Sequence, residues 1–253
     1  MKKIAENEYK TFLSWAGANK ANRVYPCSIA EGFQVGDIYV NEGSAVEAVF
    51  FWHFCGFGYI SGNASAAFLE DIYAKMLAGQ NGRRLVLITS DPAVTAFFRG
   101  KEVSMDERVE YSWHQPGNGK LPMMAGGLRI ESITPENIGS ITGRIVPSFS
   151  WESPERFLSN GFGYAAFDKA NVAAVAFSAA ISSDEIDIGV ETKEAYRRKG
   201  LAALLANQMC EHIVSLGKKP VWAHAASNQG SQNTALRCGF TQNARNTVIR
   251  RRQ

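Results

Sequence analysis

The stretch 192-TKEAYRRKGLAALLANQMCEHI-213 decides how the second half of the chain folds. From residue 201 onward its apolar residues recur every three to four positions, which predicts a helix with one buried side. The tetrapeptide 197-RRKG-200 stands directly before that helix. Because the unpaired N–H groups at a helix start already carry partial positive charge, three cations there are unfavourable unless an anion neutralises them. The turn therefore predicts a site for a phosphate or pyrophosphate group.

The elements around this stretch alternate between strands and helices. The sequence predicts a strand at 185–192, a further strand at 220–226, a short helix at 231–239 and a last strand at 247–252. Ahead of them, "GYAAF" and "VAAVAFSAAI" flank the turn "DKAN" and predict a β-hairpin. Helices are also expected to begin at Thr134–Pro135 and at Ser153–Pro154. The predicted fold class is α/β, an α+β sandwich.

The first half also mixes helices and strands, and no internal repeat is evident in the sequence. "VEAVFFWHF" predicts a buried strand, and Asn63 is expected to cap a helix that runs to Leu77. Residues 115–127 contain two prolines and four glycines, a composition typical of a linker. The prediction is a smaller N-terminal α+β domain of unassigned role at 1–125 and a second domain at 126–253.

Composition excludes several classes of function. The net charge of +3 is too small to indicate nucleic-acid binding, and the four cysteines have no CxxC spacing and no histidine cluster beside them. The longest apolar run is interrupted by Glu47 and His53 and is too short to span a membrane, and the first residues lack the apolar segment of a signal peptide. We therefore expect a cytoplasmic protein with no metal site, no nucleic-acid partner and no membrane partner.

The basic turn and the elements after it resemble the GNAT superfamily of acyl-CoA-dependent N-acetyltransferases. The family's Arg/Gln-x-x-Gly-x-Gly/Ala turn is similar to 197-RRKGLA-202, which follows the strand "IDIGVET". The family's asparagine, the small residue three positions later and the closing Gly-Phe are similar to Asn228, Ser231 and Gly239–Phe240. The resemblance covers about residues 126–253 and implies a GNAT-like acyl-CoA N-acyltransferase fold there. The whole chain resembles a bacterial two-domain branch with an N-terminal extension.

The resemblance implies that acetyl-CoA is the co-substrate. Its pyrophosphate is expected on the backbone N–H groups of the turn, whose cations attract the polyanion. Its pantetheine arm is expected along the strand before the turn, where a backbone N–H could polarise the thioester carbonyl. Gly189 in that strand suits either a β-bulge or an ordinary strand position. The residues expected to bind the cofactor are Val190, Thr192, Arg197, Arg198, Lys199, Gly200, Leu201, Ala202, Asn228 and Ser231.

An amine must lose a proton before it attacks the acetyl carbon, so a base is expected near the end of that strand. Glu191 is the first candidate, directly or through a water, and His224 in the adjacent strand is the second. Asp187 shares the face of Glu191 if no bulge intervenes. Family members often carry a tyrosine seven residues after the asparagine as general acid, and this chain has Ala235 there. Either Ser231 or a water protonates the thiolate, or the thiolate leaves unprotonated, or catalysis is weak or absent.

The function expected is transfer of an acetyl group from acetyl-CoA to an amine by direct attack in a ternary complex. The acceptor is a small-molecule or peptide amine whose identity no motif encodes, and a homodimer is left open. A non-catalytic acyl-CoA-binding or sensing module is the alternative, motivated by Ala235. A nucleic-acid-binding protein is a weaker third hypothesis, suggested by a pI near 8.6.

Overall fold

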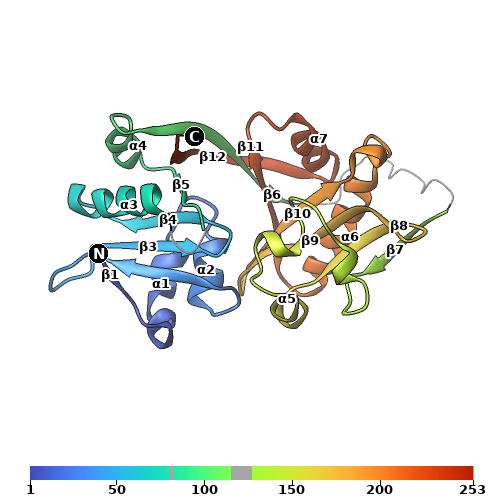
Figure 1. The fold of residues 1–253 in the computed structure, drawn as a ribbon, viewed down its shortest axis with the longest axis horizontal. Helices are drawn as coiled ribbons and strands as arrows, with labels where there is room; N and C mark the ends of the chain where they lie inside the picture. Colours follow the sequence, from blue (N-terminus) through green and yellow to red (C-terminus); the bar gives the residue numbers. More distant parts are fainter. Residues whose placement is uncertain (80–82, 115–126, 253) are drawn as a thin grey trace. The chain divides into compact units, whose positions relative to one another are not determined.

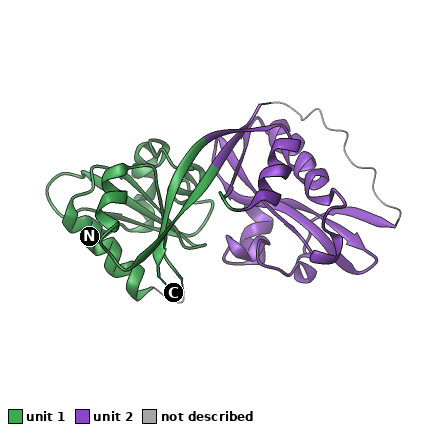
Figure 2. Ribbon diagram, turned by 90° about the horizontal axis from the view of Figure 1, so that it is seen from above, with its two compact units in different colours: residues 1–109, 225–227, 244–253 green, residues 110–224, 228–243 purple. Residues whose placement is uncertain are grey.

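The structure, a computed structural model, describes residues 1–79, 83–114 and 127–252. The chain forms two compact units, coloured separately in Figure 2. Unit 1 comprises Met1–Val109, Ala225–Ser227 and Ala244–Gln253, and unit 2 comprises Glu110–His224 and Asn228–Asn243. The units are therefore not the consecutive segments 1–125 and 126–253 expected from composition. The predicted linker lies outside the described residues except for Gly127.

Unit 1 is built on a mixed sheet whose strand order is β1-β2-β3-β4-β5-β12. Neighbours from β1 to β4 run antiparallel, β5 runs parallel to β4, and β12 runs antiparallel to β5. The bounds are β1 Lys2–Lys3, β2 Gly36–Val40, β3 Ala48–His53, β4 Phe57–Gly62, β5 Val86–Thr89 and β12 Phe240–Arg251. The buried strand predicted around residues 46–54 is thus confirmed as β3, all of whose residues are buried.

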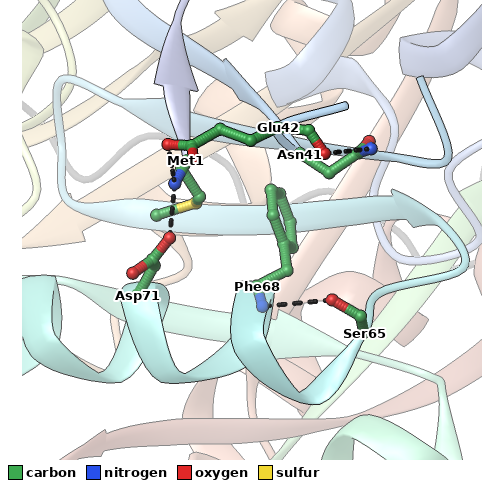
Figure 3. Close-up of polar contacts among 6 residues, drawn as sticks. All are labelled: Met1, Asn41, Glu42, Ser65, Phe68 and Asp71. Atoms are coloured by element: carbon green, nitrogen blue, oxygen red, sulfur yellow. Dashed lines mark hydrogen bonds and ion pairs between the residues drawn. The ribbon is translucent and has the colours of Figure 1, made fainter. Parts of the chain in front are cut away.

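The helices of unit 1 cover this sheet. They are the 3₁₀ helix η1 (Glu6–Phe12) and the α-helices α1 (Leu13–Gly17), α2 (Val24–Ala30), α3 (Ala66–Ala78) and α4 (Pro92–Phe98). Helix α3 buries Phe68, Leu69, Ile72 and Met76 in a core shared with β3 and β5. The predicted cap of this helix is wrong. Ser65, not Asn63, caps it, because its hydroxyl accepts a hydrogen bond from the Phe68 N–H (3.3 Å, Figure 3).

Unit 2 is built on the remaining strands of the same 12-stranded order, which are β7-β8-β9-β10-β11-β6. Neighbours from β7 to β10 run antiparallel, and β11 runs parallel to β10. The bounds are β6 Val103–Trp113, β7 Leu128–Ser132, β8 Gly163–Asp168, β9 Asn171–Ile181, β10 Glu185–Thr192 and β11 Lys219–Ala225. The predicted hairpin is confirmed, because β8 ends at Asp168 and β9 begins at Asn171.

The helices of unit 2 are α5 (Pro154–Asn160), α6 (Leu201–Ser215) and α7 (Gln229–Arg237), with the 3₁₀ helices η2 (Ile138–Ser140), η3 (Pro147–Phe149) and η4 (Glu194–Tyr196). Helix α6 packs against β8, β9 and β10 and buries the apolar stripe predicted from the sequence, including Leu205, Met209 and Ile213. The helix expected at Thr134–Pro135 is wrong, because only turns and η2 form there.

The two units repeat one order of elements, which can be followed along the colours of Figure 1. Three antiparallel strands lead to a helix, a parallel strand and a second helix, as β2-β3-β4-α3-β5-α4 in unit 1 and as β8-β9-β10-α6-β11-α7 in unit 2. The next strand then passes into the other unit, β6 at Glu110 and β12 at Ala244. Each unit therefore includes part of a strand from the other half of the sequence, which a single boundary near residue 125 could not describe.

Candidate functional site

Strand β10 loses its neighbour β11 halfway along its length. The two strands pair only from Glu185 with Lys219 to Asp187 with Val221, whereas β10 stays paired with β9 as far as Thr192. The Lys193 N–H donates to the Ala173 carbonyl (2.9 Å), which fixes which residues of β10 hydrogen-bond to β9. Because hydrogen-bonded and non-hydrogen-bonded pairs alternate, the N–H and C=O groups of Val190 and Thr192 face the open side instead.

A β-bulge lies next to this opening, but not at Gly189. Asp187 faces Ala180 and Ile188 faces Ser178, so the extra residue is on β9. Strand β10 itself keeps its alternation, which places Asp187 and Glu191 on one face as expected. Gly189 instead packs against the Phe177 ring, from which an added Cβ would lie only 2.5 Å. The bulge prediction for Gly189 is therefore wrong, and its other interpretation, an ordinary strand glycine, describes it.

The turn between β10 and α6 has the backbone of an anion cradle. Arg198 and Gly200 both adopt left-handed conformations, with φ of 63° and 80°, on either side of Lys199. Gly200 is the N-cap of α6, and no side chain caps the helix start. The first N–H groups of the helix, beginning at Leu201 and Ala202, are therefore left to another acceptor. Alternating backbone conformations before a helix start are an arrangement that binds phosphate groups.

The side chains of this turn fix its position and leave its charge in solvent. Arg197 donates from Nε to the Thr192 carbonyl (3.4 Å), and the Lys199 ammonium lies 5.0 Å from the centre of the Tyr196 ring. The Tyr196 hydroxyl donates to Asp168 Oδ2 (2.8 Å), and this hydrogen bond raises the pKa of Tyr196. All three cations predicted to attract the cofactor, Arg197, Arg198 and Lys199, are exposed.

Glu191, the first candidate base, holds a neighbouring loop. Its Oε2 accepts hydrogen bonds from the backbone N–H groups of Arg144 (2.9 Å) and Ile145 (2.5 Å). A Cβ added to Gly143 would lie 2.3 Å from its Oε1, so the loop fits closely around the carboxylate. Lys193 adds a hydrogen bond from Nζ to the Thr142 carbonyl. Sequence reasoning missed this loop, because backbone N–H groups give no residue signal and only the glycine hints at a close approach.

His224, the second candidate base, is buried in β11 and stacks on Tyr111 with the ring centres 5.2 Å apart. Asn228 caps α7, because its Oδ1 accepts the Ser231 N–H (3.1 Å), while the Ser231 hydroxyl accepts from Trp222 Nε1 (2.9 Å). Both of these predicted ligand residues thus also stabilise the start of α7. Ala235 is fully buried, so its position brings no polar group to the site.

Among the residues that the structure describes, no group of three or more His, Cys, Asp or Glu side chains could hold a metal ion. No helix of the ranges 1–79, 83–114 and 127–252 is long and apolar enough to cross a membrane. The four cysteines are free thiols. Burial raises the pKa of the Cys210 thiol, and it raises the pKa of the Cys238 thiol to about 12. Thiols held protonated in this way are poor nucleophiles.

Comparisons with known proteins show the family and the fold of this chain. The sequence model described as GNAT acetyltransferase matches residues 18–249. The uncharacterised N-acetyltransferase YdfB of Bacillus subtilis (strain 168) is 22% identical over 212 residues, which are 81% of each chain. The solved structure of a GCN5-related N-acetyltransferase-like protein from Streptococcus suis 89/1591 is 20% identical with a TM-score of 0.76, and the match covers 98% of this chain and 100% of that one. A tandem GNAT protein from the clavulanic acid biosynthesis pathway is 12% identical with a TM-score of 0.65, covering 98% and 96% of the two chains.

The family match spans nearly the whole chain. The chain belongs to the GNAT acetyltransferase family. The family region begins at residue 18 and so includes most of unit 1 as well as unit 2. The family resemblance seen in the sequence is therefore confirmed and extends well beyond residues 126–253.

Proposed function

We propose that the protein transfers an acetyl group from acetyl-CoA to an amine, with both substrates bound at once at unit 2. The observation that carries the proposal is the open backbone edge of β10, which leads directly to the uncapped, basic start of α6. A strand edge and a cradle for phosphates, in that order, suit a ligand with an amide-containing arm and a pyrophosphate. Coenzyme A has both.

Single atoms at this site support the fit of such a ligand. The Thr192 hydroxyl is buried and has no hydrogen-bond partner among the described residues. A buried hydroxyl without a partner is costly, so a ligand group at this end of β10 would relieve it. The N–H and C=O groups of Val190 would hold the pantetheine amides, and the N–H groups from Arg198 to Ala202 would hold the pyrophosphate.

The reaction consists of three bond changes. The amine nitrogen attacks the thioester carbon, the carbon–sulfur bond breaks, and the amine's proton leaves to a base. A backbone N–H at Val190–Thr192 would stabilise the negative charge that develops on the carbonyl oxygen. The proton acceptor is either Glu191 or His224. Because Ala235 is buried, the thiolate leaves unprotonated or takes its proton from water or from Ser231.

The acceptor is proposed to be a small-molecule or peptide amine, and the protein is proposed to act in the cytoplasm without a nucleic-acid or membrane partner. A homodimer stays a prediction. The buried Ala235 and the two hydrogen bonds already made by Glu191 favour a second candidate function, a module that binds acyl-CoA without turning it over.

Calorimetric titration with acetyl-CoA tests the proposal, using Gly200→Glu as the disrupting variant. A side chain at φ 80° is strained, and a carboxylate there repels a pyrophosphate, so we expect binding by the wild type and at least a hundredfold loss in the variant. Ser65→Asp adds the same charge at the start of α3 in unit 1 and serves as the control that keeps full affinity. No binding by the wild type would refute both functions, and binding without release of CoA to any amine of a broad panel would favour the second.

A further inference from the structure

Unit 1 repeats the strand opening that unit 2 uses. Strand β4 pairs with β5 only at Phe57 with Val86 and at Gly58 with Leu87, but stays paired with β3 up to Gly62. The Asn63 N–H donates to the Glu47 carbonyl (2.8 Å), which fixes the alternation along this strand. The N–H and C=O groups of Ile60 consequently face the side that β5 has left, as those of Val190 do in unit 2.

In unit 1 the chain itself occupies this edge. Asn19, in the loop between α1 and α2, donates from Nδ2 to the Ile60 carbonyl (2.9 Å) and to the Ser61 hydroxyl (3.1 Å). Its Oδ1 accepts the Ala21 N–H (2.9 Å), so both ends of the side-chain amide are bonded within unit 1. Asn19 is only 8% exposed. A primary amide thus lies on the strand edge where, in unit 2, the amides of a pantetheine arm are proposed to lie.

The start of helix α3, which follows β4, also lacks the features that the start of α6 has. The Ser65 hydroxyl caps α3, and residues 62–67 contain no charged side chain. Further along the helix, Asp71 is bound by the Met1 amine (Figure 3). The Trp15 ring closes on the end of β4, where a Cβ added to Gly62 would lie 2.5 Å from it. This helix start therefore has a side-chain cap and no cation within residues 62–67 to attract a pyrophosphate.

We infer that unit 1 contains a second slot, the place where β5 leaves the edge of β4, and that Asn19 closes it. Each chain therefore binds one acyl-CoA, at unit 2. This inference rests on the proposed function for its ligand. In unit 1 the loop after the first helix reaches the strand edge with a side chain and fills it. In unit 2 the loop between η2 and η3 is held by the side chain of Glu191, and β11 pairs with β10 only as far as Asp187.

Two experiments test the inference, one on the wild type and one on a variant. In the wild type, titration of the full chain with acetyl-CoA should give one site per chain. Hydrogen–deuterium exchange should show protection by acetyl-CoA within 189–203 but not within 59–66.

The second experiment uses the variant Asn19→Asp, which keeps the acceptor for the Ala21 N–H but places an oxygen opposite the Ile60 carbonyl. We expect faster exchange at 59–62, a midpoint of thermal unfolding lower by roughly 3–8 °C, and unchanged acetyl-CoA binding.

Asn137→Asp is the matched control, because Asn137 makes the same pair of contacts in unit 2, to the Ser132 carbonyl and from the Thr134 N–H. It should leave exchange at 59–62 unchanged. Two acetyl-CoA per chain, or protection at 59–66, would overturn the inference and leave the proposed function standing. No binding at all would overturn the proposed function, and the closure of the slot would then be refuted by unchanged exchange in Asn19→Asp.

Discussion

Helices α3 and α6 occupy the same place in the same order of elements, and yet their first turns differ in every property that matters for an anion. Helix α3 is capped by Ser65 and has no charged residue in the turn before it. Helix α6 begins at Gly200 without a side-chain cap and follows three exposed cations. The difference shows that a helix start follows an opened strand in both units, and that a few residues set its capping and its charge.

The loops that face these strands reinforce the contrast. In unit 1 Asn19 hydrogen-bonds to the backbone of β4, whereas in unit 2 Glu191 of β10 hydrogen-bonds to the backbone of its loop at Arg144 and Ile145. In unit 1 the side chain therefore belongs to the loop and lies on the strand edge, whereas in unit 2 it belongs to the strand and holds the loop. Unit 2 is therefore the half in which chemistry is expected, and unit 1 the half in which the same opening stabilises the fold.

The largest expected effect concerns a buried histidine of unit 1. His53 is fully buried, and burial, with a smaller contribution from the charge of Arg83, lowers its pKa to about 3. An unfolded chain has a histidine pKa near 6.5. Because the folded pKa is the lower one, the stability contributed by the neutral ring is complete above about pH 6.5 and is lost as the pH falls from there towards 3. The slope is about 1.4 kcal/mol per pH unit, so on the order of 5 kcal/mol is lost in total.

Urea unfolding between pH 7 and 4 checks this expectation. His53→Gln should flatten the pH dependence, whereas substitution of the exposed His114 by glutamine should leave it as in the wild type. An unchanged slope in His53→Gln would show that another group titrates.

The second effect concerns the cations before α6. Simultaneous replacement of Arg197, Arg198 and Lys199 by alanine should weaken acetyl-CoA binding by roughly 10- to 100-fold at low salt. The difference from the wild type should shrink as salt is added, because exposed charges are screened. Calorimetry at two ionic strengths measures both. Replacement of Lys2, Lys10 and Lys20 in unit 1, also exposed, should change affinity by less than a factor of two, and an equal loss there would mean that only net charge matters.

The third effect separates the two roles considered for Glu191. Glutamine keeps an acceptor oxygen for the Arg144 and Ile145 N–H groups, so a residue that only holds the loop should lose less than about tenfold in kcat. A general base would lose about 10²- to 10⁴-fold. Because of the two backbone hydrogen bonds, we expect the smaller loss, and a similar loss in Gly143→Ala, whose Cβ would lie 2.3 Å from Glu191 Oε1. A large loss in Glu191→Gln beside an active Gly143→Ala would identify the base.

The smallest effect belongs to the cap of α3. Ser65→Ala removes the acceptor for the Phe68 N–H and should lower the free energy of unfolding by about 1 kcal/mol. Acetyl-CoA affinity should not change, because this helix start is not part of the proposed site. Denaturation and titration of one preparation test both statements. Any drop in affinity would place the cofactor against unit 1 and break the comparison.

Much of unit 2 could be predicted from local patterns. The strand 185–192, the hairpin around residues 168–171 and the buried stripe of α6 follow from alternation, turn residues and helical spacing, and all are found. The basic turn was recognisable because its charge opposes the helix dipole. Predictions that relied on one residue type failed where several positions could serve, as Ser65 replaced Asn63 as the cap of α3.

The sequence by itself determined the class of fold and the family and predicted an anion site at the basic turn, because apolar periodicity and clustered charge are properties of consecutive residues. Only the tertiary structure decided the exchange of β6 and β12, the repetition of one topology in two halves and the loop held by Glu191. These depend on backbone pairing between segments far apart in the chain. Backbone N–H and C=O groups are the same in every residue except proline, so such pairing leaves little trace in the identity of the side chains.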